Sequence, residues 1–133
     1  MIEQSLLLIK PNAVQHKHIG HIISLLEKSG YHLAALKLFR FDDELASKFY
    51  AEHIGKPFFP GLVKFMTSAD TVAIIVEKEN AIHDLRDLIG AVEPDKRKPG
   101  TIRFLFGEGV TENGVHASDS FASAEREIGV IFS

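Results

Sequence analysis

Short runs of consecutive apolar residues mark the strand candidates in this chain. Residues 6–9 are continuously apolar and are followed by Lys10 and a proline, which predicts a buried strand because proline cannot continue a hydrogen-bonded ladder. Residues 71–76 form a second such run and predict a central strand covered on both faces. Residues 31–41 are rich in Leu and Phe, but their alternation changes phase near Phe39, which indicates one strand that can contain a bulge.

Apolar residues at helical spacing lie between these runs. Apolar residues at 19, 22, 23 and 26 predict a first helix, which Ser29 and Gly30 end. Asp42 is a good N-cap for the first of two short helices within residues 42–66, which we expect to form a helical hairpin. Asn80 is expected to cap a further helix, which Gly90 ends.

The order of these elements predicts the fold class. A turn-rich loop over residues 90–100 follows the third helical region, and a last strand and a helix beginning near residues 118–120 complete the chain. We therefore expect an α+β fold, a ferredoxin-like split βαβ sandwich with a four-stranded antiparallel sheet, an inserted helical hairpin and a long loop before the last strand. A chain of 133 residues has the size of one domain, so residues 1–133 are expected to form a single unit.

Composition and charge exclude several classes of protein. Hydrophobic residues make up 45% of the chain and include ten Phe, which is enough for a core without cross-links. Cysteine is absent, so disulfides, zinc knuckles and a thiol nucleophile are excluded, and a reduced cytoplasm fits. The net charge of −3 disfavours a dedicated nucleic-acid binder, and no apolar run approaches the ~20 residues of a membrane span.

The segment over residues 113–120 is the most informative candidate for chemistry. Small residues at 114 and 117 leave room around His116, and Ser120 belongs to a group of strong N-cap residues. A helix N-terminus favours anions and keeps a nearby imidazole neutral and nucleophilic, while Glu127, two turns further on, is placed to orient the ring. A structural histidine beside a helix cap is the ordinary alternative.

Other candidates have equally ordinary structural interpretations when taken singly. His16, His18 and His21 suggest a metal site, but no Cys or Asp accompanies them, so a solvated loop and helix start is expected. Taken singly, Arg86 and Arg103 are expected to form surface ion pairs, and the basic run at 96–98 is expected to be a solvated loop. Motifs for a phosphate loop, a protein kinase, a serine hydrolase elbow and a zinc protease are all absent.

Together, these segments resemble the nucleoside diphosphate kinase family from Ser5 to Phe132, in the family's order. The matching segments are KPNAVQ at 10–15, FYAEH at 49–53, KPFF at 56–59, LV at 62–63, PGTIR at 99–103, NGVHASDS at 113–120 and SAEREI at 123–128. In this resemblance His116 occupies the phosphohistidine position. The resemblance implies ping-pong transfer of a γ-phosphate from a nucleoside triphosphate to a nucleoside diphosphate, with broad base specificity, which maintains nucleoside triphosphate pools.

The resemblance also implies roles for individual residues. Lys10 and Asn113 would meet the sugar hydroxyl and phosphates, Arg86 and Arg103 would clamp phosphates, Phe58 would stack on the base, Tyr50 would lie against His116, Glu127 with Ser118 would hold the ring, and Leu62 and Val92 would complete the nucleotide site. It implies Mg²⁺ carried by the nucleotide phosphates rather than by protein ligands. It further implies a cytoplasmic homo-oligomer, a tetramer or hexamer built from a shared dimer.

Several positions depart from the family's pattern. Val92 stands where the family usually has Thr in its phosphate-binding loop, which removes a hydroxyl and predicts weaker nucleotide binding. Phe104 and Leu105 replace a common Gly-Asp pair, which leaves that loop and its subunit contacts open. Asn12 replaces a usual Asp, and Ala117 a common Gly; both are expected to be tolerated.

Two other classes of function stay open at this point. A phosphohistidine carrier, which passes phosphate to a protein, would need the histidine but not Phe58, Arg86 or Asn113. A nucleotide- or nucleic-acid-binding module without activity would fit the changes at Val92 and in the altered loop, but not the retained His116.

Overall fold

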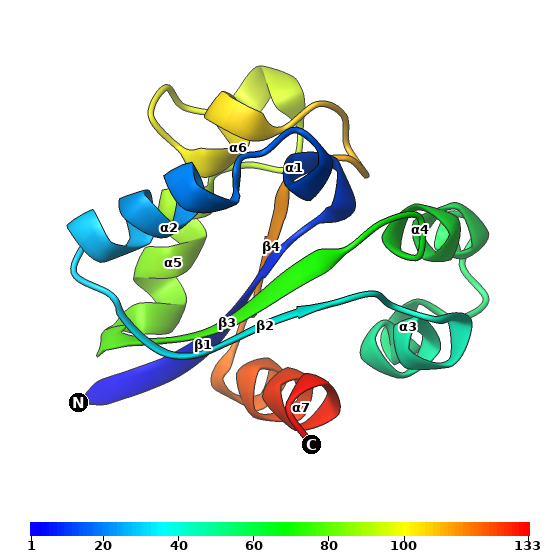
Figure 1. Cartoon of the computed structure of the whole chain (residues 1–133), viewed down its shortest axis with the longest axis horizontal. Helices are drawn as coiled ribbons and strands as arrows, with labels where there is room; N and C mark the ends of the chain where they lie inside the picture. The colour runs from blue at the N-terminus through cyan, green and yellow to red at the C-terminus, as the bar shows by residue number, and fades with distance from the viewer.

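Four strands form one antiparallel sheet in the order β2-β3-β1-β4 in a computed structural model that describes all residues from 1 to 133 (Figure 1). The strands are β1 (Ile2–Ile9), β2 (His32–Phe39), β3 (Thr71–Glu79) and β4 (Val115–Ala117). The two inner strands, β1 and β3, carry the continuous apolar runs, and Leu8 pairs with Ala73 on one side and with His116 on the other. This topology confirms the expected ferredoxin-like α+β fold.

Helices cover both faces of the sheet (Figure 1). One face carries α1 (Pro11–Gln15), α2 (Ile19–Lys28), α5 (Ala81–Ile89) and α6 (Ile102–Phe106), which share a core cluster of 15 buried residues with the sheet. The other face carries α3 (Asp43–Phe49), α4 (Phe59–Met66) and α7 (Phe121–Ile131), which share a cluster of nine. Short 3-10 turns, η1 (Ala51–His53) and η2 (Pro94–Lys96), complete the chain. The longest helix has 11 residues, and none has the length and apolar character to cross a bilayer.

Local contacts explain where several helices begin and end. The carboxylate of Asp42 accepts a 2.7 Å hydrogen bond from the N–H of Leu45 and so caps α3, as expected. The hydroxyl of Ser120 caps α7 by accepting from the N–H of Ser123 at 3.0 Å. Gly90 ends α5 at φ 87°, and a Cβ there would lie 2.5 Å from the Thr101 hydroxyl, so both backbone and space require glycine.

Other local expectations were wrong or incomplete. Asn80 precedes α5 in a left-handed conformation, but its side chain donates to Asp84 and does not cap the helix. The irregularity in β2 lies between Leu33 and Ala35, because that is where its pairing with β3 shifts register, and not near Phe39. The proline after β1 also begins α1, since proline fits the first position of a helix.

Candidate active site

A cavity of about 490 Å³ opens at the end of the sheet where β1 and β4 meet the helical hairpin and the loops that follow α5 and α6. It gathers ten of the eleven site candidates, all except Ser118, from widely separated parts of the chain. The lining residues are Lys10, Tyr50, Glu52, His53, Phe58, Leu62, Arg86, Val92, Arg103, Val110, Thr111, Asn113, His116, Ala117, Asp119 and Glu127. The chemical roles of these residues stay predictions.

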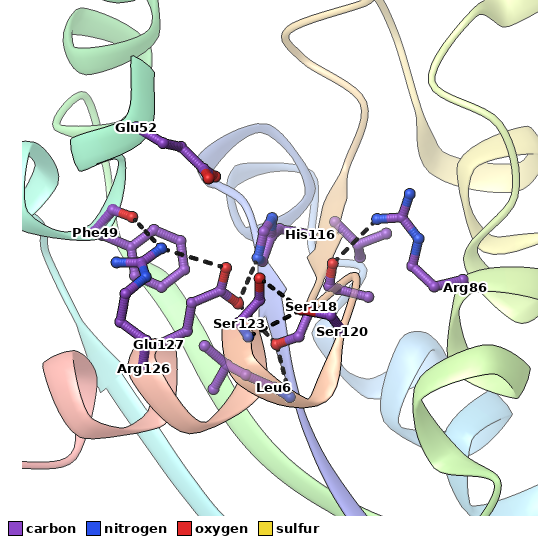
Figure 2. Close-up of polar contacts among 12 residues, drawn as sticks. Leu6, Phe49, Glu52, Arg86, His116, Ser118, Ser120, Ser123, Arg126 and Glu127 are labelled. Carbon is purple, nitrogen blue, oxygen red and sulfur yellow. Dashed lines mark hydrogen bonds and ion pairs between the residues drawn. The ribbon is translucent and has the colours of Figure 1, made fainter. Parts of the chain in front are cut away.

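His116 is held on one side of its ring only. Its Nε2 lies 3.0 Å from Oε1 of Glu127, and the buried Ser118 hydroxyl donates to the same oxygen at 2.7 Å (Figure 2). A carboxylate only accepts hydrogen bonds, so Nε2 carries the proton and Nδ1, which makes no hydrogen bond within the chain, keeps its lone pair. Glu127 is itself only 4% exposed, so it holds the ring from the protein interior.

Burial lowers the pKa of His116, against the opposing effect of Glu127, so the ring favours its neutral form. The residue lies within β4, opposite Leu8, and α7 begins only at Phe121. Desolvation, rather than the helix dipole, is therefore the main cause that favours the neutral imidazole predicted from the sequence.

Arg126 joins α7 to the end of α3 beside this site. Its guanidinium donates to the carbonyl of Lys48 at 3.3 Å and to that of Phe49 at 3.1 Å, and lies 3.8 Å from Oε2 of Glu127 (Figure 2). The ring of Phe49 in turn meets that of His116 edge-on, with centroids 5.2 Å apart. The sequence motif contained Arg126, but nothing in its spacing predicted this bridge.

Three cations, Lys10, Arg86 and Arg103, surround the inner end of the cavity. Lys10 and Arg103 are almost fully buried; Arg103 donates to the carbonyls of Gly90 at 2.9 Å and Val115 at 3.0 Å, while its Nε has no partner. Burial, and then the charge of Arg103, lower the pKa of Lys10 to about 7. Burial, followed by the charge of Arg86, likewise lowers the pKa of Arg103 to about 10. Such mutually repelling, desolvated cations favour the binding of an anion.

The outer end of the cavity is apolar and exposed. Phe58 is 52% exposed and Val110 57%, and they lie at the mouth with Leu62 and Val92. The hydroxyl of Tyr50 is buried without a hydrogen-bond partner, and burial raises its pKa. Together, the two ends of the cavity offer a flat aromatic surface outside, at Phe58, and positive charge inside.

Several lining residues were missed by sequence reasoning. Glu52 and His53 belong to the matching segment FYAEH, which was the available signal for them. Asp119 likewise lies within the segment around His116. Val110 and Thr111 carried no signal, because their position depends on the path of a loop.

Arg97 corrects the interpretation of the basic run as a solvated loop. It is only 8% exposed, and it donates to the carbonyls of Ala91 at 3.2 Å, Val92 at 2.8 Å and Gly109 at 2.7 Å. A Cβ on Gly107 would lie 2.7 Å from its Nη1, so glycine permits this close approach. Arg97 thus joins the two loops that form one wall of the cavity.

The amino-terminal histidines contact an acidic side chain and an aromatic ring. His16 pairs with Glu108 at 2.9 Å, and the rings of His18 and His21 pack on Phe106. The one group of convergent metal-ligand types lies on α5 and includes Asp84, which already contacts Lys78.

The fold and the site together define a class of protein. A neutral imidazole with one free nitrogen, facing buried cations at the end of a ferredoxin-like sheet, can accept a phosphoryl group from an anion held beside it. Comparison with known proteins identifies the family. The family model described as nucleoside diphosphate kinase matches residues 3–133, and the chain belongs to the nucleoside diphosphate kinase family.

Individual relatives agree over the whole chain. A nucleoside diphosphate kinase of Actinobacillus pleuropneumoniae serotype 3 is 52% identical over 132 residues, which are 99% of this chain and 96% of the relative. A nucleoside diphosphate kinase of Haemophilus ducreyi is 51% identical over 133 residues, which are 100% of this chain and 96% of the relative. The crystal structure of the Aquifex aeolicus nucleoside diphosphate kinase has a TM-score of 0.96 at 40% identity, covering 100% of this chain and 96% of that one.

A further solved structure contains a nucleotide. The nucleoside diphosphate kinase of Halobacterium salinarum in complex with CDP has a TM-score of 0.96 at 39% identity, covering 100% of this chain and 89% of that one. Family membership and these relatives together make this chain a phosphotransferase that moves phosphate between nucleotides.

Proposed function

We propose that phosphate transfer in this protein passes through a phosphohistidine formed on Nδ1 of His116, by a ping-pong reaction with broad base specificity that maintains nucleoside triphosphate pools. The Nδ1 lone pair attacks the γ-phosphorus of a nucleoside triphosphate, and the bond to the bridging oxygen breaks, so the nucleoside diphosphate leaves. A terminal oxygen of a second diphosphate then attacks the same phosphorus, the P–N bond breaks, and the neutral imidazole returns. The observation that carries this proposal is the one-sided attachment of the ring to Glu127.

The inner cations suit the phosphates. Transfer of a phosphoryl group needs positioning and positive charge more than covalent help from the protein. Lys10, Arg86 and Arg103 supply that charge around His116. The Oδ1 of Asn113 is buried without a partner while its Nδ2 donates to a backbone carbonyl, so Oδ1 is free to accept from a sugar hydroxyl.

The outer apolar surface suits the base. Phe58 would stack on one face of the base, with Leu62 at its edge. Stacking is tolerant of base identity because every base has a π-face, which is the physical reason to expect broad specificity. The bound CDP of the Halobacterium salinarum protein supports a nucleotide site of this kind.

Mg²⁺ fits this site as an ion carried by the nucleotide. Apart from Glu127, which already holds His116, the carboxylates lining the cavity are Glu52 and Asp119, and no three metal-ligand side chains converge there. Such a site offers no protein cage, so phosphate oxygens would hold the ion and these two carboxylates could contact its water shell. When bound, Mg²⁺ supplies neutralisation of phosphate charge.

The edge of the sheet supports the proposal of a homo-oligomer built from dimers, as a tetramer or hexamer. β2 is an edge strand, and its Leu36 and Leu38 are 51% and 60% exposed. An exposed apolar edge with unpaired backbone groups favours pairing with another chain. We further propose that residues 1–133 act as one domain, and that the protein works in the cytoplasm.

A labelling experiment tests the proposed reaction. The protein is incubated with γ-labelled ATP and Mg²⁺, and GDP is then added. Acid-labile, base-stable label that appears on the protein and then moves to GTP is the expected result. Label that stays on the protein until a protein acceptor is supplied would instead indicate a carrier, and no label would indicate a binding module.

A further inference from the structure

A second cavity of about 560 Å³ adjoins the first at one residue. Its lining comes from the end of α5 and the loop that leads to α6, and it includes Arg86, which also lines the cavity around His116. The seven lining residues are Arg86, Asp87, Gly90, Ala91, Lys96, Lys98 and Thr101. We call it the basic cavity, and neither the family resemblance nor the proposed reaction gives it a role.

The charge of the basic cavity is opposite to that of the whole chain. Arg86, Lys96 and Lys98 oppose a single carboxylate, that of Asp87, in a protein with a net charge of −3. Arg86 and Lys98 make no ion pair, whereas Lys96 lies 3.0 Å from Glu93. Two cations without an ion pair, Arg86 and Lys98, therefore remain in this concave site to attract an anion.

The walls of the basic cavity are fixed by hydrogen bonds. The hydroxyl of Thr101 donates to the carbonyl of Lys98 at 2.8 Å, and the carbonyl of Gly90 accepts from Arg103 at 2.9 Å. The second of these bonds connects the wall directly to a cation of the first cavity. The site is therefore built into the fold and does not depend on lysine side chains alone.

The lining also limits the kind of anion. Ala91 is the only apolar residue of the basic cavity, and there is no aromatic ring. The first cavity, by contrast, offers Phe58 and Leu62 to a base. A phosphoanion without a base therefore matches the basic cavity better than a nucleotide does.

We propose that the basic cavity binds a small phosphoanion that lacks a base, of which inorganic pyrophosphate is the test case, and that this site is coupled to the nucleotide site through Arg86. An anion in either cavity attracts the same guanidinium. Each ligand therefore weakens the other, and thermodynamic linkage requires the two factors to be equal. The activity would then fall when phosphoanions accumulate and nucleoside diphosphate is scarce.

Calorimetric titration of the full chain with magnesium-free pyrophosphate at low salt tests this proposal. The protein is first saturated with ADP, so that the cavity around His116 is filled. One further pyrophosphate is expected to bind, with a dissociation constant that Lys98→Gln raises by up to about fivefold, the upper end of the range for one exposed charge pair. The matched control is Lys64→Gln, which changes the same net charge on α4 and should leave the constant unchanged.

Activity measurements complete the test. Without pyrophosphate, Lys98→Gln should have the kcat and KM of the wild type; with pyrophosphate present, its KM for diphosphate should rise less. Pyrophosphate binding that vanishes as ADP reaches saturation, or that falls equally in both lysine variants, would overturn the proposal. A second equivalent of ADP that bound more tightly than pyrophosphate would overturn the assignment to a ligand without a base. Failure of ADP itself to bind would count against the nucleotide site instead.

Discussion

The two ends of the main cavity are built in opposite ways. At the inner end, His116 is attached to a carboxylate that is 4% exposed and that also accepts from the buried Ser118. At the mouth, Phe58 and Val110 are more than half exposed. Group transfer demands reacting atoms held within a fraction of an ångström, while stacking on a base tolerates variation. The rigid inner end is therefore suited to the chemistry, and the exposed mouth to recognition of the base.

The difference follows from the elements that carry each end. His116 lies on β4, which is paired with β1, and Glu127 lies in the middle of α7, so both are held by regular backbone hydrogen bonds. Phe58 precedes α4 at the turn of the hairpin, and Val110 lies in a loop. Sites on strands and helices are held more rigidly than sites on loops.

Removal of the imidazole should have the largest effect. His116→Ala is expected to abolish acid-labile labelling by γ-labelled ATP, because it removes the one imidazole that Glu127 holds with its Nδ1 free. Labelling is measured after base treatment, and circular dichroism checks that the fold is intact. His32→Ala, on the exposed edge strand β2, is the control and should label normally. Label that persists in His116→Ala would refute the proposed site.

Release of the ring from its carboxylate should have the next largest effect. Glu127→Ala is expected to slow phosphorylation of His116 by about a hundredfold, the cost of misplacing a reacting group by about 1 Å. Single-turnover mixing with labelled ATP measures that rate. Glu127→Gln keeps the shape and guards against a simple loss of folding, and it should be slowed less.

The matched control for that variant lies on the same helix. Glu125 is exposed on α7, and Glu125→Gln should leave the phosphorylation rate unchanged. Equal rates in Glu127→Ala and the wild type would show that the ring needs no orienting group.

Loosening the wall of the cavity should affect binding more than chemistry. Arg97→Gln removes the donors that hold Val92 and Gly109 together, and is expected to raise the KM for diphosphate about tenfold, as for the loss of one buried charge-assisted hydrogen bond. The phosphorylation rate at saturating ATP should change little, because His116 is held from the opposite side. Arg97→Lys should recover part of the affinity. A fall in kcat with unchanged KM would contradict this separation of the two ends.

Most of the fold could be predicted because its strongest signals are local. The apolar runs of β1 and β3, the Asp42 cap and the glycine at 90 all appear directly in the sequence and are found in the structure. Helices α1 and α6 could not be found by periodicity, since each has only five residues. The place of the bulge in β2 depends on its pairing with β3, which no single strand encodes.

The site was predictable as a set of residues but not as an arrangement. Ten of the eleven candidates that the motifs identified line one cavity. The motifs could not show that His116 lies inside a strand or that Arg126 bridges two helices. Arg97 was predicted to be solvated because a run of charged residues does not show that two loops, separated in the sequence, meet in the fold. Tertiary contacts of this kind override local patterns.

The inner cations predict a pH dependence of binding. Lys10 has a pKa of about 7 in the free folded protein, so it loses its charge as the pH rises above that value. Bound phosphate favours the charged form, and binding of diphosphate should therefore take up a proton and weaken from pH 7.5 to 9. Calorimetry in buffers of different ionisation enthalpy measures the proton uptake. Lys10→Met should bind more weakly at pH 7 but show little change with pH.

The same shift has a defined sign for stability. Between pH 7 and 10.5 the unfolded chain keeps a proton on Lys10 that the folded chain has released, so the unfolded state binds more protons. The free energy of unfolding therefore rises with pH across this window, relative to Lys10→Met. An equal slope in the two proteins would contradict the assigned pKa.

The smallest expected effect is a gain at the mouth. Val92→Thr restores a hydroxyl of the same shape at a half-exposed position, and Arg97 already holds the backbone carbonyl of this residue at 2.8 Å, so the loop need not move. The KM for diphosphate should fall severalfold, as about 1 kcal/mol from one hydrogen bond implies, while the transfer rate at saturation stays the same. Val92→Ala, which removes two methyl groups without adding a hydroxyl, should not lower KM. An unchanged or higher KM in Val92→Thr would mean that another group already binds the phosphate there.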